Sequence, residues 1–163
     1  MGVIIGIVVI IIAVIAITLQ QKRTLKASVA GTLPRMEEKT GWQELFTDAD
    51  GEHHYIIEKR KDQSGNVIGA WDRLTYSKKG KDNYILKRRS NGMFITGMDT
   101  LTRRYTLYYL KCGEKEQQFA IIKVFEASRD GKTLDYGKTG SQKDWDNVPP
   151  EAVVGKLAKI ACP

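Results

Sequence analysis

The residues with the most evident potential for chemistry are two adjacent histidines, His53 and His54, which directly follow a run of acids, Asp48, Asp50 and Glu52. Adjacent residues of a strand point to opposite faces of a sheet, so the two histidines cannot bind one metal ion together. Residues 48–51 also resemble the start of a calcium-binding loop, but the glycine comes too early and Lys59 stands where the loop needs a bidentate acid. We therefore interpret the segment as a hairpin turn and expect neither a metal nor a cofactor.

No pairing of a nucleophile with a base is recognisable either. The sequence contains no Gly-x-Ser-x-Gly motif and no glycine-rich phosphate loop before a helix. Neither Cys112 nor Cys162 lies near a predicted histidine partner, and the chain offers no zinc-binding spacing of His and Cys. The paired acids flank predicted turns, with nothing to mark a cleft: Glu114 with Glu116, and Asp144 with Asp146. We expect the protein not to be an enzyme.

The elements that would position these residues are predicted to be mostly antiparallel strands. Turn signals recur along the chain, at Asp50-Gly51, Ser64-Gly65-Asn66, residues 79–83, Asn91-Gly92 and Asp130-Gly131. Between them lie stretches rich in aromatic and β-branched residues, which are typical of strands at hairpin spacing. These stretches are residues 54–58, 67–76, 84–88, 93–96, 103–112 and 118–127.

The clearest alternation is in residues 103–112, where Tyr105, Leu107 and Tyr109 share one side and Thr106, Tyr108, Leu110 and Cys112 share the other. Residues 118–125 are apolar on both sides, which predicts a place inside the sheet.

The last segment changes to a helical period. Pro149-Pro150-Glu151 is typical of a helix start. Apolar residues then recur at helical spacing, Val153, Leu157 and Ile160 with Val154, Ala158 and Ala161 beside them. Gly155 should cost this helix about 1 kcal/mol, so packing must hold it. The predicted fold class is α+β, an antiparallel sheet of about six strands with a C-terminal helix packed on it.

The N-terminus predicts a membrane segment. Residues 3–19 are apolar without a charge, and a helix from residue 1 to 19 spans roughly 28 Å, about one hydrocarbon core. The small-residue site at 28–30 lies beyond three cations, Lys22, Arg23 and Lys26, so we favour an uncleaved anchor over a cleaved signal. The domain organisation is then a transmembrane anchor or signal (1–21), a polar tether (22–40) and a β-rich domain (41–163).

The net charge of +7 is unevenly distributed. Residues 1–35 hold four cations and no acid. Residues 36–58 have a net charge of −6, and residues 59–111 have a net charge of +9. In residues 112–163 the cations and the acids are equal in number. The candidate binding residues are the cations of the middle hairpins: Lys59, Arg60, Lys61, Lys78, Lys79, Lys81, Lys87, Arg88, Arg89, Arg103 and Arg104. They could hold an acidic protein, a polyanionic glycan, anionic lipid or nucleic acid. The alternative is a set of solvated turns, neutralised in part by the acidic segment before them.

Two observations disagree about the compartment. The cations Lys22, Arg23 and Lys26 after the apolar run favour a cytoplasmic domain by the positive-inside rule. Two lone cysteines are consistent with buried thiols, and a disulfide between them would require an oxidising compartment.

The order of several features resembles a known family. Trp42 opens the domain, residues 55–58 form a strand, and Trp71 follows a short hairpin. Cys112 ends a long strand, and Trp145-Asp146-Asn147-Val148-Pro149-Pro150 leads into a helix that closes on Cys162. Over about residues 41–163 this order resembles the surface-adhesin protein E-like family of bacterial secreted domains.

The resemblance implies a sheet crossed by a C-terminal helix, with a disulfide between strand and helix that carries over to Cys112 and Cys162. It therefore favours the non-cytoplasmic side. The chain departs from the family in having Lys111 where an acid usually precedes the cysteine, and Pro150-Glu151-Ala152 where Pro-Gly-Ser is common. Adhesion to host matrix would also need display on the outer surface, whereas an uncleaved inner-membrane anchor would hold the domain in the periplasm.

From these features we predict a non-enzymatic, exported or membrane-anchored binding module of the bacterial cell envelope, with its domain in the periplasm or outside. It would be a surface adhesin or a periplasmic accessory of an envelope assembly. Its partners would be the membrane, through residues 3–19, and another protein or a polyanionic glycan rather than nucleic acid; a homodimer is left open. The alternative is a cytoplasmic-facing, membrane-anchored basic domain that binds nucleic acid or anionic lipid.

Overall fold

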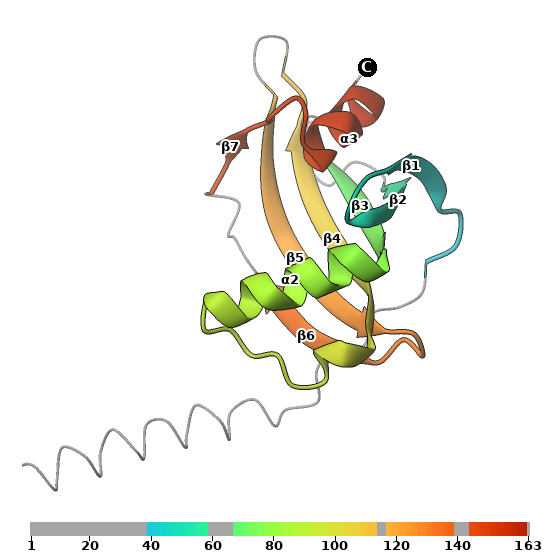
Figure 1. Ribbon diagram of the computed structural model, residues 1–163. Coiled ribbons are helices and arrows are strands. Elements are labelled where there is room, and N and C mark those ends of the chain that lie inside the picture. Colours follow the sequence, from blue (N-terminus) through green and yellow to red (C-terminus); the bar gives the residue numbers. More distant parts are fainter. Residues whose placement is uncertain (1–38, 59–66, 114–116, 139–143, 163) are drawn as a thin grey trace, which may run out of the picture. The chain divides into compact units, whose positions relative to one another are not determined.

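A computed structural model of the chain describes residues 39–58, 67–113, 117–138 and 144–162. They form an antiparallel sheet with two α-helices against one face (Figure 1). The predicted α+β architecture with a C-terminal helix on a sheet is thus confirmed. The predicted membrane segment and residues 22–38 of the predicted tether lie outside the described residues. Within the described ranges, no helix has the length and apolar character needed to cross a bilayer.

The sheet is a meander whose strands lie side by side in chain order. Its strands are β1 (Gln43–Thr47), β2 (Gly51–Ile57), β3 (Val67–Tyr76), β4 (Leu101–Lys111), β5 (Gln118–Ser128) and β6 (Thr133–Lys138). The short β7 (Asp146–Asn147) pairs with the first residues of β5, and β6 pairs with the later ones. The helices are α2 (Lys78–Ser90) and α3 (Val153–Ala161), and a 3-10 turn, Met98–Thr100, precedes β4.

Four of the expected strands are confirmed. Residues 54–58, 67–76, 103–112 and 118–127 correspond to β2, β3, β4 and β5, and β5 is paired along both edges. The predicted alternation of residues 103–112 is also correct. Tyr105 and Leu107 belong to the core cluster on one face, and Leu110 belongs to the cluster on the other. The strands β1, β6 and β7 were not expected from the sequence.

The expected turn at residues 79–83 and strand at 84–88 are wrong, because this segment is helix α2. Ser77 caps the helix: its Oγ accepts a hydrogen bond from the Gly80 backbone N–H at 2.9 Å and donates one to the Ala49 carbonyl at 3.0 Å. Gly80 is needed because a Cβ there would lie 2.1 Å from the backbone oxygen of Asp50. The glycine therefore marks a close contact with the β1–β2 turn, not a chain reversal.

Residues 93–96, the other expected strand, also lie outside any strand. They form part of the irregular connection between α2 and the 3-10 turn. In this connection the Met93 N–H bonds to the Arg88 carbonyl at 2.9 Å, so the chain folds back on the end of α2 instead of entering the sheet.

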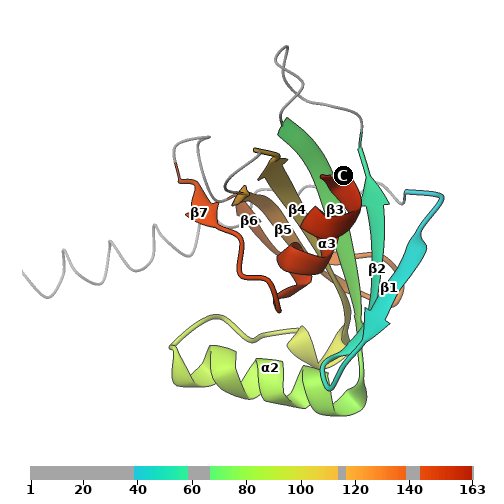
Figure 2. The same cartoon turned by 90° about the horizontal axis from the view of Figure 1, so that it is seen from above.

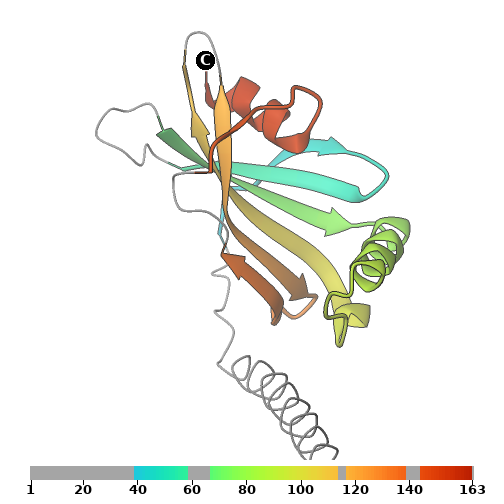
Figure 3. The ribbon, with the colours of Figure 1, turned by 90° about the vertical axis from the view of Figure 1, so that its left-hand side faces the viewer.

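Helix α3 covers one end of the sheet and α2 the other, on the same face (Figures 2 and 3). A cluster of buried apolar residues lies under α3: Ala70, Leu110, Val154, Leu157, Ala158 and Ala161. The buried stripe of α3 is therefore centred on Val154 and Leu157, and Ile160, which we expected to be inside, is 44% exposed. The opposite face carries the second cluster, built on Trp71, Tyr105, Leu107 and Phe125, with Trp42 and Trp145 packed against it.

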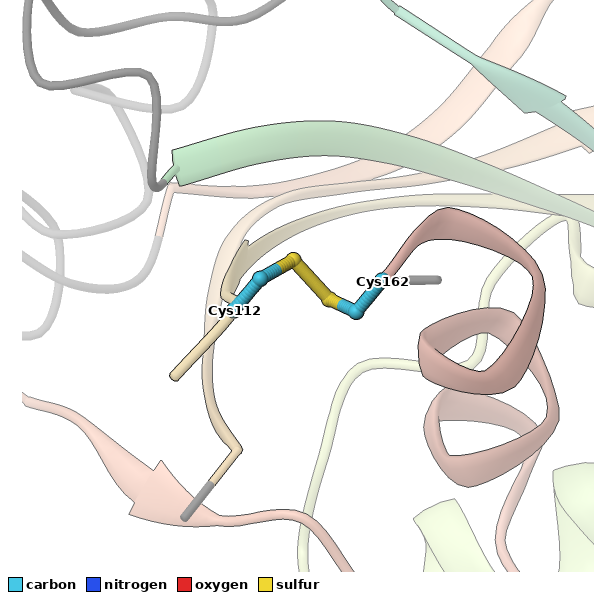
Figure 4. The surroundings of a disulfide bond; sticks show 2 residues. All are labelled: Cys112 and Cys162. Carbon is cyan, nitrogen blue, oxygen red and sulfur yellow. A yellow bond between two sulfur atoms is a disulfide. The ribbon is translucent and has the colours of Figure 1, made fainter. Parts of the chain in front are cut away.

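The disulfide Cys112–Cys162 is confirmed; it joins the residue after β4 to the residue after α3, with the two Cα atoms 5.4 Å apart (Figure 4). The bridge closes a loop across a sequence separation of 50 residues. In the chain-entropy account, a loop of this length stabilises the folded state by roughly 4 kcal/mol. The end of α3 is therefore held covalently as well as by packing.

Gly155 provides a test of how closely α3 approaches the preceding chain. A Cβ at this position would lie 2.4 Å from the carbonyl oxygens of both Pro149 and Pro150. Although alanine is the better helix former by about 1 kcal/mol, we expect Gly155→Ala to lower the free energy of unfolding by about 1–3 kcal/mol through overpacking. Chemical denaturation monitored by circular dichroism measures this change.

The matched control is Gly137→Ala on β6, where a Cβ would meet no atom within 4 Å. It should change the free energy of unfolding by less than about 0.5 kcal/mol. If the Gly155→Ala protein were as stable as the native one, the close approach of the Pro149 and Pro150 carbonyls would not be the reason for a glycine at position 155.

A candidate binding surface on helix α2

The predicted basic residues lie mainly on a helix, not on hairpins. Six of the eleven candidates belong to α2: Lys78, Lys79, Lys81, Lys87, Arg88 and Arg89. Arg103 and Arg104 lie near the start of β4, on opposite faces of the sheet because they are adjacent on a strand. The remaining three, Lys59, Arg60 and Lys61, lie outside the described residues.

Helix α2 is attached to the sheet through a buried carboxylate, Glu126 on β5. The Tyr84 hydroxyl on α2 donates a hydrogen bond to Glu126 Oε1 at 2.6 Å, and Arg104 Nε donates to the same oxygen at 2.9 Å. The Arg104 guanidinium also lies over the Tyr84 ring, 4.5 Å from its centroid. Glu126 is 2% exposed, so these contacts form away from water, where charge-assisted hydrogen bonds are strong.

Arg88 adds a second attachment and is itself only 4% exposed. Its guanidinium forms an ion pair with Asp135 on β6, donates to the Tyr84 hydroxyl at 3.1 Å, and donates to the Phe94 carbonyl at 3.0 Å. The candidate cations Arg88 and Arg104 are thus used to hold α2 on the sheet. They are not available for a partner.

Burial governs the titration of this network. It raises the pKa of Glu126, an effect that the nearby Arg104 guanidinium and the Tyr84 hydroxyl oppose. Burial also raises the pKa of Tyr84, and the Glu126 carboxylate adds to that increase. Tyr84 therefore keeps its proton and acts as a donor to Glu126.

Most of the cations of α2 that the network does not use are exposed. We call Lys78, Lys79, Lys87 and Arg89, all exposed, the α2 ridge. Lys78 pairs with Asp82 at 2.9 Å, one turn along the helix. Within the part of the chain that the structure describes, the side chains of Lys79, Lys87 and Arg89 form no ion pair, so the ridge carries uncompensated positive charge. Lys81, half-buried, donates to the Asp99 carbonyl at 3.1 Å.

The two adjacent histidines, His53 and His54, are separated, as expected. His53 is 4% exposed; its Nδ1 lies 3.0 Å from Asp72 Oδ1, and its ring stacks on Phe46 with centroids 4.5 Å apart. His54 lies on the other face of β2. Residues 48–50 form the β1–β2 turn, closed by Asp48 Oδ1, which accepts from the Asp50 and Gly51 N–H groups at 2.8 and 3.1 Å. A search of the described residues finds no group of His, Cys, Asp and Glu suited to a metal ion.

Sequence reasoning missed the residues that hold the surface in place: Tyr84, Glu126 and Asp135. One local signal was present, because Glu126 is a lone acid within the apolar β5. An acid in a buried strand needs a cationic partner, but its partners come from β4 and α2, which sequence spacing does not connect.

The Glu126 attachment predicts a stability effect. Glu126→Gln keeps the shape of the side chain but removes the charge that faces Arg104, so we expect the free energy of unfolding to fall by roughly 2–3 kcal/mol. Urea denaturation gives this value. Asp82→Asn, which breaks the exposed pair with Lys78, is the control and should leave stability nearly unchanged. Equal effects of the two substitutions would contradict a special role of Glu126.

Comparison of the chain with protein-family models, with curated proteins and with solved structures finds no match.

Proposed function

We propose that the protein is a non-enzymatic binding module of the bacterial cell envelope that uses the α2 ridge to hold an acidic partner, another protein or a polyanionic glycan. The observation that carries this proposal is the division of cations on α2. Arg88 is neutralised against the sheet, whereas Lys79, Lys87 and Arg89 are exposed and have no ion-pair partner among the described residues.

The ridge suits an acidic partner for two physical reasons. A helix fixed by the Glu126 and Arg88 attachments holds its outer cations in a constant arrangement, which reduces the entropy lost on binding. Uncompensated charge of one sign also steers an oppositely charged molecule toward the surface and raises the association rate. No comparable arrangement supports catalysis in the described residues, where His53 is buried under Phe46.

The disulfide and the family resemblance support a location of the domain outside the cytosol. A persistent Cys112–Cys162 bridge suits an oxidising environment, so we place the domain outside the cytosol, tethered by residues 3–19, as a member of the adhesin E-like family. The role is then that of a surface adhesin or a periplasmic envelope accessory. The second candidate, a cytoplasmic-facing domain that binds nucleic acid or anionic lipid, is favoured by the cations Lys22, Arg23 and Lys26 after the apolar run.

The ridge predicts salt-dependent binding of a polyanion. We expect the affinity of the full-length protein for a heparin oligosaccharide to fall with salt, and the slope of log K against log[salt] to decrease by about two in a Lys79→Gln, Arg89→Gln variant. Isothermal titration calorimetry at several salt concentrations measures the slope. Lys111→Gln with Lys159→Gln, two exposed cations at the end of β4 and on α3, is the charge-matched control. The α2 ridge would be excluded as the heparin-binding surface if both double variants changed the salt slope equally.

A location outside the cytosol predicts that Cys112 and Cys162 are joined by a disulfide in the cell. If thiols are blocked with an alkylating reagent at the moment of lysis, Cys112 and Cys162 should remain unlabelled until the protein is reduced, and mass spectrometry reads this directly. Two alkylated cysteines in freshly isolated membranes would support the cytoplasmic alternative. Protease treatment of spheroplasts gives an independent answer, because only a domain outside the inner membrane is cleaved.

A further inference from the structure

A groove of about 380 Å³ runs beside α2 and is lined by residues of the helix and of strands β3 and β4. Its volume is at the lower end of the range of ligand sites, about 300–1,000 Å³, so it suits a residue or two of a peptide. Arg88 and Arg104 line it, but both are already neutralised, by Asp135 and by Glu126. A ligand must therefore be recognised by the other residues of the groove.

Part of the groove wall is apolar and aromatic. Tyr76 and Tyr84, both half-buried, line it, and their rings stack with centroids 5.5 Å apart. Met93, just beyond the end of α2, also lines the groove and is 48% exposed. Aromatic rings provide large contact areas, and methionine adapts to the shape of an apolar partner. This part of the wall suits one aliphatic or aromatic side chain.

The helix side of the groove offers hydrogen-bond donors that are open to solvent. Asn83, Lys87 and Asn91 line the groove, and all three are exposed. They follow one another at four-residue intervals, so they lie along one side of the helix and its C-terminal cap. Their side chains form no hydrogen bond or ion pair with the described residues. An ammonium group flanked by two amides provides donors for a carboxylate, and Lys87 adds charge complementarity.

The position of Asp50 limits the ligand to a single negative group. Asp50 lines the groove, is exposed, and has its backbone against Gly80. Lys87 comes seven residues after Gly80, about 10 Å along the helix axis. A ligand with one carboxylate can lie at Lys87 and stay away from Asp50. A chain of closely spaced acids that filled the groove would bring a second negative group toward Asp50, which is unfavourable.

The C-terminal residue of a polypeptide combines one carboxylate with one apolar side chain. Both groups are bonded to the same Cα atom, so both can enter one groove. An acid next to an apolar residue within an extended chain does not allow this, because neighbouring side chains point to opposite sides. Recognition of a chain end through its carboxylate is also a recurring mode of peptide binding.

We propose that the groove binds the C-terminal residue of a partner protein, an aliphatic or aromatic residue with a free carboxylate. Its side chain lies against Tyr76, Tyr84 and Met93. Its carboxylate accepts from Lys87 and from the amides beside it. The inference rests on the proposed function, because acidic residues further from the chain end would lie on the α2 ridge. It narrows the partner to an acidic protein with an apolar C-terminal residue.

The test uses acetylated tetrapeptides that begin with the uncharged sequence Gly-Ser-Gly, so that the α2 ridge contributes little to binding. One ends in phenylalanine with a free carboxylate, the second in phenylalanine with a carboxamide, and the third in alanine with a free carboxylate. We expect the full-length protein to bind the first peptide saturably in calorimetry. The second and third should each bind at least roughly tenfold more weakly, because one lacks the charged acceptor and the other lacks the apolar contact.

Two substitutions separate the polar and the apolar parts of the groove. Lys87→Gln should reduce the preference for the carboxylate over the carboxamide to less than roughly threefold. Met93→Ser should weaken binding of the first peptide roughly threefold. Both residues are exposed, so neither change should lower the melting temperature. Lys79→Gln, a ridge cation that does not line the groove, is the control for Lys87→Gln and should bind the peptides as the native protein does.

The inference is overturned if the carboxylate and carboxamide peptides bind equally, if neither saturates, or if Lys79→Gln and Lys87→Gln weaken binding to the same extent. Loss of heparin binding in Lys87→Gln, without any peptide binding, would assign the groove to a glycan instead. The two proposals fail separately. Salt-dependent heparin binding with no peptide binding leaves the ridge and removes the groove, whereas peptide binding with a heparin salt slope insensitive to Lys79 and Arg89 does the reverse.

Discussion

The placement of α2 depends on one buried carboxylate, Glu126. Hydrophobic burial contributes little to holding helix α2, because its fully buried residues are a glycine and an arginine, Gly80 and Arg88. Instead, Oε1 of Glu126 accepts one hydrogen bond from the helix, through Tyr84, and one from β4, through Arg104. Hydrogen bonds to charged groups contribute about 1.5–3 kcal/mol each and are directional, so they fix the orientation of the helix as well as its attachment. The position of the α2 ridge follows from this geometry.

The two helices are held by different kinds of interaction: α3 by apolar packing and a disulfide, and α2 by ion pairs and hydrogen bonds. Helix α3 buries Val154 and Leu157 against the sheet, approaches the backbone of Pro149 and Pro150 closely, and ends in a disulfide. Such contacts respond little to salt or pH, whereas the ion pairs and hydrogen bonds that hold α2 depend on the protonation of Glu126. The α3 end therefore provides a constant framework, and the charged surface lies at the end whose stability depends on electrostatics.

The parts of the fold that could be predicted are those whose signal is local. The strand β4 alternates in the sequence as it does in the sheet, β5 is marked by a run that is apolar on both sides, and α3 begins shortly after two prolines. Helix α2 was missed because Lys79-Gly80-Lys81 is typical of a turn by composition. The reason for Gly80 is its contact with the backbone of Asp50, which no local pattern contains. Arg88 and Arg104 were taken as surface cations for the same reason, since Asp135 and Glu126 reach them only through the sheet topology.

The positive charge of α2 is divided between the sheet and the solvent. The thirteen-residue helix carries six cations, which repel one another, and only one acid. The sheet relieves part of the repulsion by pairing Arg88 with Asp135. The outer cations attract over a Debye length of about 8 Å at physiological salt, which favours encounter but distinguishes poorly between anions. Discrimination between anions needs desolvated donors and acceptors that a wrong ligand leaves unpaired, so the exposed charge of α2 governs the rate of encounter more than the choice of partner.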